Sequence, residues 1–107
     1  MAWLTRDGQV LASAEVARNR GERRRGLRGR TELDGVFVLR ARSIHTIGMQ
    51  VTIDVAFCDA DGVVVRVLTV PPQRITRPCW AARSAIEAPE GALRAWGVAV
   101  GDRLEIR

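Results

Sequence analysis

The sequence predicts a mainly β fold, namely a compact antiparallel β-sandwich or barrel-like domain with one or two short helices. Apolar and polar residues alternate over several short stretches, which is typical of strands that bury one face. Turn residues separate these stretches, and no long amphipathic helix stands between them. With 107 residues, the chain is expected to form one β-rich domain over residues 1–107.

The strongest strand pair is predicted in the middle of the chain. Large apolar side chains alternate with smaller or polar ones in residues 51–58, and residues 63–70 form a second, β-branched run. The turn at 59–62 ends in an Asp-Gly pair, which suits a positive φ. Pro71-Pro72 ends the second run because proline cannot donate to a strand ladder. We therefore expect a β-hairpin, and its apolar character places it at the centre of the sheet.

A second hairpin is predicted at the N-terminus. Residues 2–6 and 9–16 have strand character and flank the Asp7-Gly8 turn. Trp3 and Leu11 are the expected core members of this hairpin.

An arginine-rich segment follows. Residues 18–30 hold seven arginines in thirteen positions, together with three glycines. Each glycine weakens a helix by about 1 kcal/mol relative to alanine. We therefore expect only a short helical turn here, anchored by Leu27 and Leu33.

The remaining elements are short and follow from turn residues and alternation. A helix that begins near Pro89 and ends at Trp96 is expected, because Gly97 suits a C-terminal cap. The expected strands are 35–39, 43–46, 84–88 and 103–107, and residues 71–78 are expected to form a proline-rich loop or edge segment.

Composition limits the classes of function. All 17 basic residues are arginine, and the net charge is +5. Such a charge permits binding of phosphate or nucleic acid, although a solvated arginine surface is the favoured explanation. No apolar run is long enough to span a membrane and no signal peptide is visible, so we expect a cytoplasmic protein without a membrane partner.

The cysteines do not predict a metal site or a disulfide. Cys58 and Cys79 lack the close spacing of zinc ligands, and a reducing compartment disfavours a disulfide. We therefore expect no metal and no cofactor, and Cys58 is interpreted as a small core residue.

Six short motifs occur in a fixed order along the chain. They are GLRGR at 26–30, GVFVL at 35–39, HTIGM at 45–49, IDVAFCDADGVVV at 53–65, IEAPEG at 86–91 and GDRL at 101–104. Together they resemble one known family, the bacterial and archaeal domain-of-unknown-function family numbered one-nine-two. The resemblance covers nearly the whole chain and implies a compact β-rich domain with no established activity. Arg28 stands where that family usually has methionine, and further departures surround the family's pocket, so no ligand is carried over.

Three ionisable residues are candidates for a site. His45 is the only side chain with an unperturbed pKa near neutrality, and it would serve as a base, a ligand contact or a hydrogen-bonded structural residue. Asp54 lies in an apolar strand and needs a partner, for which Arg25 or Arg30 would be suitable. Glu87 lies near the start of the predicted helix and would pair with an arginine or accept backbone N–H groups.

These residues support two hypotheses. The first is a non-catalytic binding or accessory module that holds a small anionic ligand or a protein segment. The alternative is a small hydrolase-like enzyme that uses His45 with Asp54 or Glu87. Binding is favoured over catalysis, nucleic acid is the less favoured partner, and a monomer or weak dimer is expected. The candidate ligand-binding residues are Arg25, Arg30, His45, Met49, Asp54 and Glu87.

Overall fold

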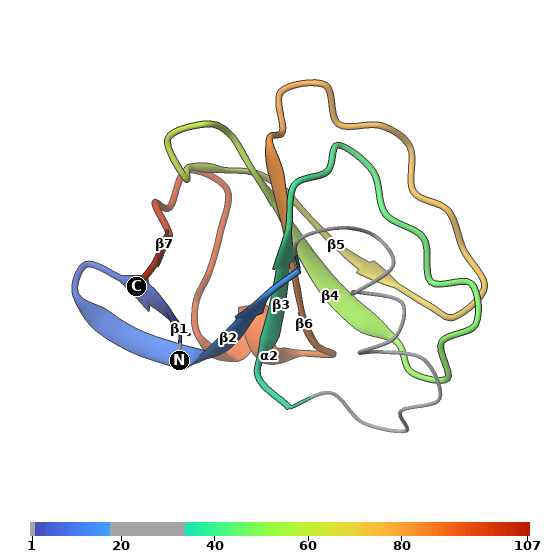
Figure 1. Ribbon diagram of the computed structural model, residues 1–107, viewed down its shortest axis with the longest axis horizontal. Coiled ribbons are helices and arrows are strands. Elements are labelled where there is room, and N and C mark those ends of the chain that lie inside the picture. Colours follow the sequence, from blue (N-terminus) through green and yellow to red (C-terminus); the bar gives the residue numbers. More distant parts are fainter. Residues whose placement is uncertain (1, 18–33) are drawn as a thin grey trace.

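The computed structural model describes residues 2–17 and 34–107 and confirms the mainly β fold. The predicted helical turn in residues 18–30 lies outside the described residues. In the described part of the chain, strands form one seven-stranded sheet with a single short helix (Figure 1). The elements are β1 (Ala2–Arg6), β2 (Gln9–Val16), β3 (Val36–Leu39), β4 (Ile53–Cys58), β5 (Val64–Val70), β6 (Ser84–Pro89), α2 (Ala92–Ala95) and β7 (Glu105–Ile106).

The order of strands in the sheet is β5-β4-β6-β3-β2-β1-β7. Neighbouring strands are antiparallel except for β2 and β3, which run parallel. Both predicted hairpins are present. The prediction that the β4–β5 hairpin is central is wrong, because β5 is an edge strand. An apolar sequence indicates that the faces of a strand are buried. It does not indicate that the strand has hydrogen-bonded neighbours on both sides, so it cannot distinguish a central strand from an edge strand.

The sheet curls so that its two ends approach each other, giving a half-barrel. The start of β5 meets the segment that leads into β7: the N–H of Val64 donates to the carbonyl of Asp102 (2.8 Å), and that of Leu104 donates to the carbonyl of Gly62 (2.9 Å). Gly62 allows this approach, because a Cβ at this position would lie 2.5 Å from the Leu104 carbonyl oxygen.

The two faces of the sheet carry separate apolar cores. The first core lies inside the curl, receives side chains from β1 to β6, and includes Leu93 of α2. The second core lies on the opposite face of β3, β4 and β6, where Phe37, Val55 and Phe57 pack with Ile44 and Met49 from outside the strands. Because both faces are covered, all six residues of β4 are buried.

Two loops, residues 40–52 and 71–83, cover the second core and run side by side along the sheet (Figure 1). We call them the loop layer. His45 and Ile75 form an antiparallel bridge between the loops. The Thr46 hydroxyl donates to the carbonyl of Pro71 (2.6 Å) and accepts from the N–H of Arg74 (3.0 Å), and Thr76 makes equivalent contacts with the backbone of Ile44.

Three predicted details differ from the structure. Residues 43–46 form only the single bridge at His45 rather than a strand, because side-chain hydroxyls replace part of the ladder. Trp3 is 40% exposed, since Leu4 takes the inward position and the loop layer does not extend over β1. The helix spans only Ala92–Ala95, because Pro89 still belongs to β6.

Candidate functional site

The predicted site residues lie on two different faces of the sheet. Glu87 pairs in register with Phe37 and Val55, which belong to the second core, so its side chain projects from that face. Asp54 is the neighbour of Val55 in β4 and therefore projects from the opposite face. The sheet separates the two carboxylates, so one cleft cannot be lined by both.

Asp54 has a structural environment. Its Oδ1 accepts a hydrogen bond from the Thr69 hydroxyl (2.8 Å), and its Oδ2 accepts one from the backbone N–H of Gly91 (2.9 Å). These two partners are a hydroxyl and an amide, and the guanidinium partners suggested by the sequence, Arg25 and Arg30, lie outside the described residues. Both carboxylate oxygens are thus used to hold β5 and the start of α2 against β4.

The other described candidates lie on the second face. Glu87 is fully buried, Met49 is part of the second core, and His45 is half-buried in the loop layer. Arg25 and Arg30 lie outside the described residues. The structure therefore groups His45, Met49 and Glu87 on one side of the sheet and places Asp54 on the other.

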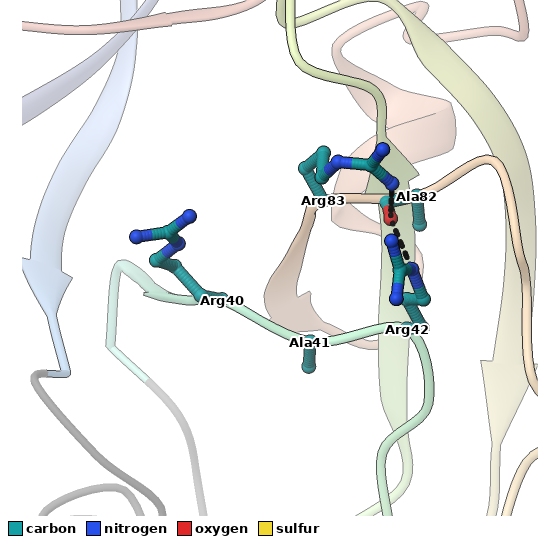
Figure 2. Close-up of a pocket in the computed structure, with 5 residues that line it drawn as sticks. All are labelled: Arg40, Ala41, Arg42, Ala82 and Arg83. Atoms are coloured by element: carbon teal, nitrogen blue, oxygen red, sulfur yellow. Dashed lines mark hydrogen bonds between the residues drawn. The ribbon is translucent and has the colours of Figure 1, made fainter.

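A pocket of about 450 Å³ lies at one end of the loop layer (Figure 2). Its walls come from two segments, one that leaves β3 and one that enters β6. The lining residues are Arg40, Ala41, Arg42, Ala82 and Arg83.

Backbone contacts and a shared acceptor position these arginines. The pairing of Leu39 with Ala85 brings the two segments together, and the N–H of Arg83 donates to the carbonyl of Cys58 (2.7 Å). Nε of Arg42 and Nη1 of Arg83 both donate to the carbonyl oxygen of Ala82, each at 3.2 Å. Figure 2 shows these two guanidinium groups meeting at that oxygen, with Arg40 on the other side of the pocket.

The lining of the pocket is positively charged. Within residues 2–17 and 34–107, the ion pairs join Arg6 to Asp102 and Arg107 to Glu105, and none of them includes a pocket arginine. A guanidinium has five N–H donors, and the Ala82 carbonyl uses one from Arg42 and one from Arg83. The remaining donors suit the oxygens of phosphate or carboxylate, which guanidinium groups bind in forked geometry.

Sequence reasoning missed this pocket. Arg40 and Arg42 are two residues apart, so an extended backbone would direct both side chains to the same face of their segment, and this could have been anticipated. Arg83 is far away in the sequence and joins them only through the pairing of β3 with β6.

Neither a metal centre nor a membrane-crossing helix is found in the part of the chain that the structure describes. No group of three or more His, Cys, Asp or Glu side chains there is placed to hold a metal ion. No helix there is long and apolar enough to cross a bilayer.

Similar sequences occur in archaea. A UPF0127 protein of Pyrococcus abyssi is 43% identical over 63 residues, and one of Pyrococcus furiosus is 38% identical over 63 residues. Each match covers 59% of this chain and 54% of the relative. The chain thus matches about half the length of these relatives.

Solved structures share the fold. A protein of unknown function from Novosphingobium aromaticivorans has a TM-score of 0.80 at 19% identity, covering 97% of this chain and 82% of that one. A protein of Sinorhizobium meliloti described as a "putative transcription regulator" has a TM-score of 0.76 at 21% identity, covering 97% and 90%. The sequence model of the family DUF192, described as "Uncharacterized ACR", matches residues 2–106.

Proposed function

Because this chain belongs to the DUF192 family of uncharacterised proteins, its function has to be inferred from its own residues, and we propose that it is a non-catalytic binding domain for a small anionic ligand. The ligand would be held in the pocket of Arg40, Arg42 and Arg83 through its phosphate or carboxylate groups. The ligand class, a small anion, is the one that the sequence predicts. The binding residues are different from those that the sequence predicts.

One observation carries the proposal: three guanidinium groups line one pocket, and no described carboxylate forms an ion pair with them. Guanidinium groups that line one pocket repel one another, and an anionic ligand would relieve that repulsion. The volume of about 450 Å³ lies within the range typical of small-molecule sites.

The lining residues favour binding over catalysis. Arginine stays protonated at any physiological pH, and alanine has no reactive group, so the pocket lining offers neither a general base nor a nucleophile. Of the two carboxylates considered as partners of His45 in a hydrolase-like role, Asp54 is disfavoured, because both of its oxygens are already engaged by Thr69 and Gly91. The pairing of His45 with Glu87 stays a prediction.

Calorimetric titration with pyrophosphate, phosphate and citrate at low ionic strength tests this function. We expect binding of at least one of these anions, and we expect Arg42→Gln combined with Arg83→Gln to weaken it by at least about tenfold, since two charge-assisted contacts are lost. Arg103→Gln and Arg94→Gln together are the matched control, because both arginines are exposed and lie outside the pocket lining. Absence of binding by every anion, or an equal loss in the control, would contradict the proposal.

A further inference from the structure

The loop layer and the first residue of the strand that follows each loop are basic and contain no acidic residue. Residues 40–53 and 71–84 contain five arginines and no carboxylate, so these two stretches carry a net charge of +5. The other residues that the structure describes contain five arginines and ten carboxylates. Within the described part of the chain, the loop layer is therefore the basic region of the fold.

The same layer exposes large apolar side chains. Trp80 is 74% exposed and Ile75 is 72% exposed, the highest values among the large hydrophobic residues that the structure describes. Ile47 adds a third such side chain at 53%. Isolated exposed apolar residues are ordinary on protein surfaces, but three on one basic layer indicate an interaction surface.

The backbone brings these residues onto one continuous layer. Ile75 forms the bridge with His45, and Ile47 follows Thr46, whose hydroxyl joins the two loops. Trp80 lies in the turn closed by the hydrogen bond from the N–H of Ala82 to the carbonyl of Cys79 (3.0 Å), so it is adjacent to the arginine pocket. Figure 1 shows both loops on the outside of the sheet, away from the curl.

We propose that the loop layer docks onto a membrane surface that contains anionic lipids. The arginines engage the headgroup phosphates, and Trp80, Ile75 and Ile47 insert at the boundary between headgroups and acyl chains. Surface-bound proteins combine these two contributions, since attraction to anionic lipid adds to the burial of apolar area. Tryptophan and arginine suit this depth, because each joins an apolar body to a polar end.

Two features favour a lipid surface over other polyanions. Binding of single-stranded nucleic acid relies on aromatic side chains that stack on bases, whereas two of the three exposed apolar residues here are isoleucine. The neighbouring pocket is lined by arginine and alanine only. The exposed side chains of Ile47, Ile75 and Trp80 are therefore not part of its lining. Residues on exposed loops and turns are well placed to enter a soft layer.

This inference departs from the expectation of no membrane partner, which rested on the lack of a long apolar run. It concerns attachment to a surface and requires no spanning segment. Three of the five loop-layer arginines also line the proposed anion pocket, whereas the apolar contribution comes from residues outside that pocket, so the two proposals can be tested separately.

Co-sedimentation with vesicles tests the proposal. We expect binding to phosphatidylcholine vesicles that contain phosphatidylglycerol, much weaker binding to phosphatidylcholine alone, and a decrease with added salt. Trp80→Ala combined with Ile75→Ser should reduce binding by at least about tenfold, because each side chain loses its burial in the interface. Val100→Ser with Val10→Ser is the matched control, since both valines are exposed outside the loop layer.

The outcomes separate this proposal from the previous one. The Trp80→Ala, Ile75→Ser variant should still bind pyrophosphate in calorimetry if the pocket binds anions. Equal binding to neutral and anionic vesicles, full binding by that variant, or the same loss in the valine control would overturn the membrane proposal. A preference for single-stranded DNA over anionic vesicles at equal ionic strength would also overturn it.

Discussion

Asp54 Oδ2 accepts a hydrogen bond from the backbone N–H of Gly91 at 2.9 Å, and this contact joins β4 to the start of α2. Gly91 is the N-cap of α2 and adopts a φ of 82°, and the helix has no side-chain cap of its own. The carboxylate of a distant strand therefore accepts from the N–H of the N-cap residue, as the N3 side chain does in a capping box.

We expect Asp54→Ala to lower the free energy of unfolding by about 3 kcal/mol, because it leaves the Gly91 N–H and the Thr69 hydroxyl without their acceptor. Asp54→Asn should cost less, since its amide oxygen still accepts one hydrogen bond. Urea unfolding of both variants measures this difference. An alanine variant as stable as the parent chain would show that Asp54 is not a structural residue.

The contact between Gly62 and Leu104 closes the curl of the sheet and should be sensitive to a single methyl group. In Gly62→Ala the new Cβ would lie 2.5 Å from the Leu104 carbonyl oxygen, at a φ of +82°. Gly48→Ala is the control, because Gly48 has a similar φ of +86° and no atom within 4 Å of the new Cβ. We expect the control to lose about 1 kcal/mol and Gly62→Ala to lose at least about 2 kcal/mol more in urea unfolding. Equal losses would mean that backbone strain alone accounts for the effect.

Thr46 joins the two loops of the loop layer. Its hydroxyl donates to Pro71 and accepts from Arg74, and the side chain is fully buried. We expect Thr46→Val to cost about 2 kcal/mol, because the shape is kept while both hydrogen bonds are lost. Hydrogen exchange of the Arg74 amide should become faster in that variant, whereas Thr46→Ser should retain most of the protection. Unchanged exchange in Thr46→Val would refute this role.

We expect ionisation of Cys58 to lower the free energy of unfolding at alkaline pH. Burial, with a smaller contribution from Asp59, raises the pKa of the Cys58 thiol from 9.0 to about 11. The thiol therefore ionises at a lower pH in the unfolded chain than in the folded one. Its contribution is fully present below pH 9.0 and is lost progressively up to about pH 11. The total loss should be about 3 kcal/mol.

The amino-acid composition limits the number of other groups that titrate in this pH range. The chain has no tyrosine, and all 17 of its basic residues are arginine, so few other groups titrate in that range. Urea unfolding from pH 8 to pH 11 should show the decline in the parent chain and a much flatter profile in Cys58→Ala. The same decline in both chains would assign it to another group.

The local pattern of residues was sufficient to predict the elements near turns. Asp7 and Gly8 both have positive φ, as their turn requires, and the strands on either side begin and end where alternation indicates. Gly62 and Gly97 likewise adopt positive φ at the predicted turn and helix end. These features depend on neighbours within a few residues, so the sequence contains the information directly.

The site depended on contacts that no local pattern contains. Arg83 reaches Arg40 and Arg42 only because β6 pairs with β3, and Asp54 and Glu87 are separated because adjacent strand residues project to opposite faces. The amino-acid sequence by itself determined the β class of the fold, the hairpin turns and the basic charge. The tertiary structure alone decided which charged groups meet, because strand order and sheet curl set distances between residues far apart along the chain.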